Sequence, residues 1–163
     1  MIDSYIAQYG RRLYGLCMSL CANPVEADDL YQETWLRVLR KIHQYDSNHP
    51  FEAWLTQICV NLYRDSLRRK KCNPFYDLFS STEEKDNQLA AVAGEELPDY
   101  STLYEAVKQL PDKLRITVIL HYFQELDVNQ TAHVLKIPPG TVKSRLSKAR
   151  KLLKEVLKDD IDL

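Results

Sequence analysis

The sequence predicts an all-α protein: two small helical domains joined by a flexible acidic linker, with a helix-turn-helix in the second domain. Apolar residues recur every three to four positions through most of the chain, which is the spacing of an amphipathic helix. No segment alternates convincingly as a strand would. The 163 residues include only four glycines and seven prolines, which favours long helices over tight turns. This length suits one domain or two small ones.

The distribution of charge divides the chain into three parts. Residues 1–72 carry ten Lys/Arg and eight Asp/Glu, residues 73–99 carry one lysine and seven acids, and residues 100–163 carry eleven basic and eight acidic residues. The middle part lacks periodicity and is rich in polar residues, which indicates a linker. We therefore expect domains at 1–72 and 100–163 with an acidic linker at 73–99. Alternating blocks of charge in a small protein also suggest contact with a polyanion.

The first domain is predicted to begin with two helices. Residues 4–21 form the first, with an apolar stripe of Ile6, Tyr9, Leu13, Leu16 and Leu20. The second begins where Asn23 can cap, Pro24 fits the first helical position and Glu26 can reach back as in a capping box. It is expected to run to about Gln44, with a stripe of Leu30, Thr34, Trp35, Val38 and Ile42.

A polar turn at 45–50 precedes a third long helix, from Phe51 to about Lys71. The second domain is then predicted to contain helices at about 101–110 and 112–124, separated by Pro111. A short helix capped by Asp127 is expected to end near Leu135, and a last helix covers about 139–158.

The stretch DVNQTAHVLKIPPGTVKSRLSKAR has the proportions of a helix-turn-helix. Ala132 is small where the second helix must approach closely, and Ile137 is expected to pack inward. Pro139 starts the second helix, because its missing N–H would lack a helical partner there anyway. The inward stripe of that helix is predicted to be Val142, Leu146, Ala149 and Leu153.

The opposite face of this last helix is predicted to bind DNA. The face is basic and hydroxylic: Thr141, Lys143, Ser144, Arg145, Ser147, Lys148, Arg150 and Lys151. A merely solvated face usually mixes acids with bases, whereas no acid occurs between Asp127 and Glu155. The first residues of such a helix reach base edges, where Lys, Ser and Thr find partners. Arg145, Arg150 and Lys151 are better placed for phosphates.

Other chemistries find little support in the sequence. Cys17 and Cys21 lie four apart and could bind zinc with a third cysteine and His43, but no CxxC or HxxxH pair supports this. Buried thiols are the favoured interpretation, and no metal or cofactor is expected. No nucleophile–base pair or phosphate loop indicates an enzyme. Neither a signal peptide nor an apolar run near ~18 residues is present, so we expect a cytoplasmic protein without membrane insertion.

Four stretches, taken in order, carry a family resemblance. They are ADDLYQETWLRVLR (27–40), FEAWLTQICVNLYRDSLRRKK (51–71), LPDKLRITVILHYFQEL (110–126) and PPGTVKSRLSKAR (138–150). Together they resemble bacterial RNA polymerase sigma factors of the extracytoplasmic-function (ECF) group of the sigma-70 family. The resemblance implies an alternative sigma factor, not an enzyme, which binds core polymerase at its clamp helices and flap and directs it to promoter DNA. It also implies a partner anti-sigma factor.

The resemblance implies roles for particular residues. The first domain, as sigma region 2, would dock on polymerase through Asp28, Asp29, Gln32, Glu33, Leu36 and Arg37. It would recognise and melt the −10 promoter element with Asp46, Ser47, Asn48, His49, Asn61, Arg64, Arg68, Arg69, Lys70 and Lys71. The second domain, as sigma region 4, would read the −35 element with the basic face described above. The linker would lie in the RNA-exit channel of the polymerase.

Each assignment has a simpler alternative. Acids early in the second helix are stabilised by the helix dipole whatever their function, and so is the basic cluster at the end of the third helix. Asn61 could be a surface amide without a role, and Tyr63 is as easily a core residue as a base-stacking one. The whole chain could be a stand-alone helix-turn-helix regulator, but stretches 27–40 and 51–71 would then have no purpose. It could also be an interaction protein whose basic helix only stabilises itself.

Two departures from the family pattern concern the helix-turn-helix. The short helix has Asn129-Gln130-Thr131-Ala132 where the family often has Glu-Ile-Ala. Lys136 stands where the turn often has glycine, so a left-handed conformation there would cost free energy.

Overall fold

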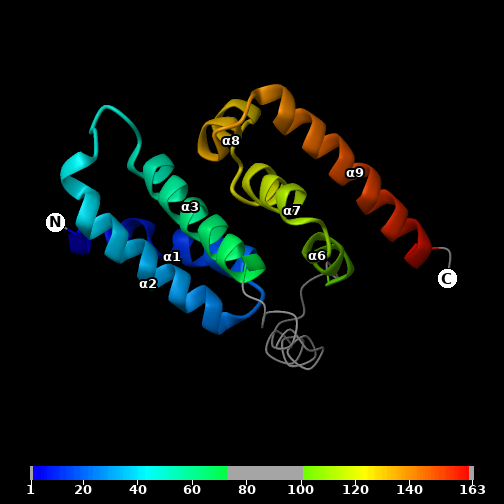
Figure 1. The fold of residues 1–163 in the computed structure, drawn as a ribbon, viewed down its shortest axis with the longest axis horizontal. Helices are drawn as coiled ribbons and strands as arrows, with labels where there is room; N and C mark the ends of the chain where they lie inside the picture. Colours follow the sequence, from blue (N-terminus) through cyan, green and yellow to red (C-terminus); the bar gives the residue numbers. More distant parts are fainter. Residues whose placement is uncertain (1, 73–100, 162–163) are drawn as a thin grey trace.

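The computed structural model describes residues 2–72 and 101–161, and all of their regular elements are helical (Figure 1). The predicted linker at 73–99 lies outside the described residues. In the first domain the elements are α1 (Ile2–Leu20), α2 (Pro24–Lys41), the short 3-10 helix η1 (Ile42–Gln44) and α3 (Phe51–Cys72). In the second they are α6 (Ser101–Lys108), α7 (Asp112–Val118), η2 (Ile119–Phe123), α8 (Val128–Leu135) and α9 (Pro139–Ile161). None of these helices is both long and apolar enough to cross a membrane.

Three helices pack around the core of the first domain. Most of the predicted stripes are buried there, including Leu16 and Leu20 of α1 and Val38 of α2. Ile6 is an exception, because it was expected in the interior and is exposed. Phe51 begins α3 and stacks against Tyr5, with the ring centroids 4.1 Å apart. Aromatic pairs of this kind add to the burial of their apolar area, so they fix the start of α3 against α1.

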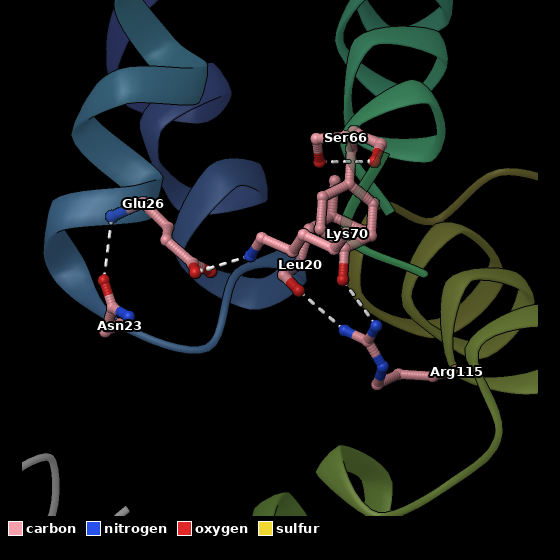
Figure 2. Close-up of polar contacts among 7 residues, drawn as sticks. Leu20, Asn23, Glu26, Ser66, Lys70 and Arg115 are labelled. Carbon is pink, nitrogen blue, oxygen red and sulfur yellow. Dashed lines mark hydrogen bonds and ion pairs between the residues drawn. The ribbon is translucent and has the colours of Figure 1, made fainter. Parts of the chain in front are cut away.

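The predicted start of α2 is confirmed except at Glu26. Asn23 has an extended backbone, and its side chain accepts a hydrogen bond from the Glu26 amide at 2.8 Å. Pro24 occupies the first turn. We expected the Glu26 carboxylate to reach back and complete a capping box. It instead forms an ion pair with Lys70 of α3 at 2.5 Å (Figure 2). Asn23 therefore caps α2 without a reciprocal bond from Glu26, whose carboxylate pairs with a lysine of a neighbouring helix instead.

The second domain is built on the long helix α9, which packs against α6, α7 and α8 (Figure 1). Asp127 caps α8 as predicted, and Gln130 completes a capping box with it. The single helix predicted at 112–124 is α-helical only to Val118, because residues 119–123 form a π-helix. A π-turn inserts an extra residue, and such insertions often occur at functional sites.

Lys136, at the turn between α8 and α9, adopts the left-handed conformation that the sequence analysis identified as costly for a residue with a Cβ, with φ 57° and ψ 47°. Its amide donates to the carbonyl oxygen of His133, and the Ile137 amide donates to that of Ala132. These bonds close the C-terminus of α8 in the way that glycine usually does. A Cβ in this conformation costs roughly 1–2 kcal/mol.

We expect Lys136→Gly to raise the free energy of unfolding by about 0.5–1 kcal/mol. Glycine removes the left-handed strain, and its extra freedom in the unfolded chain offsets only part of that gain. Chemical denaturation followed by circular dichroism measures the change. Lys136→Ala is the matched control, since it removes the charge but keeps Cβ, and we expect no gain from it. Equal stabilisation by both variants would show that the charge, not the backbone, is responsible.

The two domains are in contact. Helix α3 of the first packs against α8 of the second, and α1 approaches η2. Figure 1 shows α3 beside the α7–α8 pair. The predicted DNA-contacting helix α3 therefore has one side turned toward the helix-turn-helix domain.

Candidate functional site

The helix-turn-helix predicted at 127–150 is present, with α8 and α9 packed on each other. Ala132 is buried where the helices meet, and Ile137 is half-buried in the turn. Pro139 is the first residue of α9, as predicted. The turn therefore delivers α9 with its N-terminal end exposed, as a DNA-reading helix requires.

The faces of α9 separate apolar from basic side chains. Val142, Leu146 and Ala149 are buried, and Leu153 is half-buried. The exposed face consists of Lys143, Ser144, Ser147, Lys148, Arg150 and Lys151. Thr141 and Arg145, which we expected outside, are half-buried. They are four apart and each directly precedes a buried residue, so they lie at the edge of the inward stripe.

Arg150 is held by an aromatic side chain that sequence reasoning did not identify. Its Nε donates to the Tyr122 hydroxyl at 2.8 Å, and its guanidinium carbon lies 5.9 Å from the centroid of that ring. Tyr122 belongs to the π-helix and is 48% exposed. No sequence signal could have found this pair, because the π-turn shifts the register of every side chain after it. Arg150 keeps its two terminal nitrogens for an external anion.

The exposed face of α2 contains the predicted protein-docking residues. Asp28, Asp29, Gln32, Glu33 and Leu36 are exposed, and Asp28 accepts a hydrogen bond from the Tyr14 hydroxyl at 2.9 Å. Arg37 is only half-buried, yet its Nε is buried without a hydrogen-bond partner among the residues that the structure describes. All of these residues thus lie on one face of α2, and Arg37 lies at the edge of that face.

An apolar groove of about 300 Å³ adjoins this face, between α1 and α2. Its lining residues are Ile6, Tyr31, Gln32, Trp35, Leu36 and Leu39. Leu36 and Leu39 are 48% and 50% exposed. Exposed apolar side chains with a polar rim are typical of contact surfaces. The sequence analysis identified Gln32 and Leu36 but missed the other groove residues, because Ile6 and Trp35 fitted the apolar stripes of their helices.

The loop between η1 and α3 is organised around Asp46. Its carboxylate accepts from the Asn48 amide at 3.0 Å and lies 3.2 Å from His49 Nδ1. The hydrogen bond from the Asn48 backbone, followed by the His49 ring, lowers the pKa of Asp46, so it is a carboxylate at neutral pH. Ser47, Asn48 and His49 are exposed. The loop offers ordered hydrogen-bonding groups to solvent.

Asn61 does not join the loop in one pocket. It is half-buried on α3, ten residues beyond Phe51, which places it about 15 Å farther along the helix. The structure therefore places Asn61 apart from the loop, although both were assigned to the −10 element.

The basic residues at the end of α3 differ in what they contact. Arg68, Arg69 and Lys71 are exposed. Lys70 is engaged by Glu26, and Arg64 donates to the Leu135 carbonyl oxygen of α8 at 3.1 Å. Tyr63 is buried, so the core interpretation of this residue is confirmed. Arg68 lies 3.5 Å from Asp65 and Lys71 lies 3.2 Å from Asp112, so the positive charge at the end of α3 is exposed but partly paired.

Three of the four cysteines behave as core residues. Cys17, Cys21 and Cys59 are buried and Cys72 is exposed. The sulfur atoms of Cys17 and Cys59 lie 3.8 Å apart, and the pKa of Cys17 is raised by its contact with Cys59 and by burial. Within 2–72 and 101–161, no three His, Cys, Asp or Glu side chains are grouped as metal ligands.

Comparison with known proteins agrees with this geometry. Residues 5–72 match the family model of sigma-70 region 2, and residues 100–153 match that of sigma-70 region 4. The chain is 33% identical to the ECF RNA polymerase sigma factor SigW of Bacillus subtilis over 160 residues, covering 93% of this chain and 86% of SigW. It is 31% identical to SigM of the same species over 155 residues, covering 94% and 93%.

The fold is also shared with a solved sigma factor. The RpoE chain from Bartonella quintana, in complex with the anti-sigma factor NepR, superposes with a TM-score of 0.72 at 21% identity and covers 96% of both chains. The two matched regions, in this order on an all-helical frame, and the identity to SigW over nearly the whole length establish the relationship. The chain belongs to the ECF group of RNA polymerase sigma factors and acts as an alternative sigma factor that directs RNA polymerase to promoters.

Proposed function

We propose that this sigma factor reads the −35 element with the exposed face of α9 and binds core polymerase through α2. The observation that carries the proposal is the face of α9. Its exposed residues from Lys143 to Lys151 are basic or hydroxylic, and the buried stripe of Val142, Leu146 and Ala149 lies opposite. A face of one sign on the second helix of a helix-turn-helix suits a duplex groove lined by phosphates.

Docking on polymerase is assigned to Asp28, Asp29, Gln32, Glu33, Leu36 and Arg37. The support is an exposed polar face that adjoins an apolar groove on the same helix. An acidic rim around exposed leucines suits a basic and apolar partner surface, which we take to be the clamp helices of core polymerase. A second contact, between region 4 and the polymerase flap, completes the assignment.

Contact with the −10 element is assigned to the 46–49 loop and α3. The exposed loop groups can pair with base edges, and Arg68, Arg69 and Lys71 can hold phosphates of an opened strand. Asn61 would contact a different nucleotide from the one that the loop contacts, because it lies well along α3 from the end that adjoins the loop. Arg64, Lys70 and Lys71 would first have to leave their protein partners.

The remaining assignments concern the domains, the cellular location and the regulator of the protein. We assign 1–72 to region 2, 73–99 to a linker in the RNA-exit channel, and 100–163 to region 4. The protein works in the cytoplasm as an initiation factor without catalytic activity. An anti-sigma factor is its expected regulator, because the structurally similar RpoE chain was solved with one.

Transcription by core polymerase on a library of −35 elements tests the reading role of α9. We expect Lys143→Ala to cost about 1–3 kcal/mol on the preferred promoter and to relax the preference at one or two base pairs. Arg150→Ala should weaken all promoters alike and reduce the salt dependence by about one phosphate contact. We expect different effects from the two substitutions because Lys143 lies near the start of α9, where base edges are within reach, and Arg150 lies two turns farther along.

Two exposed basic residues on other helices serve as matched controls. Lys108→Ala on α6 and Arg11→Ala on α1 remove the same charges away from α9. They should change neither base preference nor salt dependence. If both α9 variants lose activity uniformly, without a change in preference, then the helix holds DNA without reading it.

Tyr122→Phe is expected to weaken binding of polymerase holoenzyme to promoter DNA by about 0.5–1.5 kcal/mol. The change removes the hydroxyl that orients Arg150 and leaves the ring beneath the guanidinium. Equilibrium binding to labelled promoter DNA measures it. In an Arg150→Ala background the same change should have no effect, because the partner is absent. An equal loss in both backgrounds would mean that Tyr122 acts independently of Arg150.

A further inference from the structure

Arg115 of the second domain inserts its guanidinium into the first. The side chain belongs to α7 and is only 9% exposed. One terminal nitrogen donates to the Leu20 carbonyl oxygen at 2.6 Å (Figure 2). The other donates to the Tyr63 hydroxyl and to Asp112, the latter at 3.0 Å. A buried guanidinium is costly unless its donors are satisfied, and here two of the three acceptors come from the first domain.

These partners are chemically suited to an arginine. Leu20 is the last residue of α1, so its carbonyl oxygen lacks a helical donor and lies at the negative end of the helix dipole. Burial alone would lower the pKa of Arg115, but Tyr63 and Asp112 raise it overall. Burial raises the pKa of Tyr63 to about 12, so its hydroxyl stays neutral. The cluster is fully paired only while the two domains touch.

Two further contacts join the domains, and both use basic residues assigned to the −10 element. Arg64 donates to the Leu135 carbonyl oxygen, and Lys71 pairs with Asp112 at 3.2 Å. Burial, together with the nearby charges of Arg68 and Arg145, lowers the pKa of Arg64. Arg145 is a residue of the −35 face, so this packing brings the two DNA-binding surfaces close together.

We propose that the cluster of Arg115 with Leu20, Tyr63 and Asp112 is an interdomain latch, through which region 2 binds its own region 4 and keeps the free protein closed. The inference rests on the proposed promoter contacts. The −10 and −35 elements are about one and a half turns of duplex apart, roughly 50 Å. In the closed form α3 packs against α8, and α8 packs against the reading helix α9, so α3 and α9 cannot reach both elements. Opening the latch releases Arg64 and Lys71 for DNA.

Distances between two spin labels test the latch without DNA. Cys72, at the end of α3, is exposed while the other three cysteines are buried, so it accepts one label. Lys154→Cys on the exposed face of α9 accepts the second. We expect a short, narrow distance distribution for the labelled protein and a longer, broader one after Arg115→Met. A distribution unchanged by this substitution would overturn the latch.

Two further variants keep the test interpretable. Tyr63→Phe removes a single oxygen from the cluster and should open the protein in part, even if Arg115→Met fails to fold. Arg12→Met is the matched control, because Arg12 pairs with Glu52 inside the first domain at 2.9 Å, and we expect no change in distance. Opening by Arg12→Met to the same extent would contradict a specific role for Arg115.

Promoter DNA supplies the functional arm of the test. Free protein with Arg115→Met should bind duplex promoter DNA at least threefold more tightly than the parent protein at the same salt concentration. If labels report opening but affinity does not rise, the latch does not withhold the basic groups and the inference fails. Failure of the proposed function looks different, because the parent protein would then direct no promoter-dependent transcription with core polymerase, whatever the label distances.

Discussion

Replacing Asp29 and Gln32 of α2 together with alanine is expected to lower affinity for core RNA polymerase by more than tenfold, about 1.4 kcal/mol. Both side chains are exposed and stand beside the apolar groove that Leu36 and Leu39 line. Polar groups at the rim of an apolar contact fix its orientation and exclude water. Titration of fluorescently labelled core polymerase with each protein measures the loss.

The chain offers a matched control for this pair. Asp3 and Gln8 are an exposed aspartate and glutamine on α1, and their replacement by alanine should leave polymerase affinity within twofold. Circular dichroism should show the same helix content in both double variants. Unchanged affinity after the α2 substitutions would leave this face with the simpler role of helix solubility and would remove the docking assignment.

Truncating Leu146 to alanine is expected to lower the free energy of unfolding by about 2–5 kcal/mol. The side chain is 2% exposed and lies in the middle of the inward stripe of α9. Removing it leaves a cavity that the packed helices can fill only in part. Chemical denaturation measures the change. Activity on promoters that depend on the −35 element should fall with it, because the basic face is carried by the same helix.

Ser147→Ala provides the stability control. Ser147 is the next residue along and is exposed, so this change should stay within about 0.5 kcal/mol of the parent protein. A loss below 1 kcal/mol for Leu146→Ala would show that the stripe does not anchor α9.

Local sequence signals predicted most of the fold. Asn23, Pro24 and Asp127 mark helix starts that the structure confirms, since a cap depends only on residues within one turn. The start of α9 at Pro139 follows from the same kind of signal. The π-helix at 119–123 was not predicted, because it lies at the end of its helix, where too few residues follow to reveal a shift in apolar periodicity.

The candidate surfaces were predicted less completely. The exposed faces of α2 and α9 follow from helical spacing, and the structure shows most of their residues exposed. The groove beside Leu36 was missed, since it forms only where α1 and α2 meet. The proposed roles in docking and in reading DNA stay predictions until the experiments above are done.

The sequence by itself determined the helices, the face that each one buries and the family of the protein, because caps, apolar periodicity and motifs are properties of neighbouring residues. Only the tertiary structure decided which cations are free. Lys70, Arg64, Arg150 and Arg115 contact partners 28 to 95 positions away along the chain. Such contacts depend on how helices pack, since a carbonyl or hydroxyl group becomes available to an arginine only when packing brings it within hydrogen-bond distance.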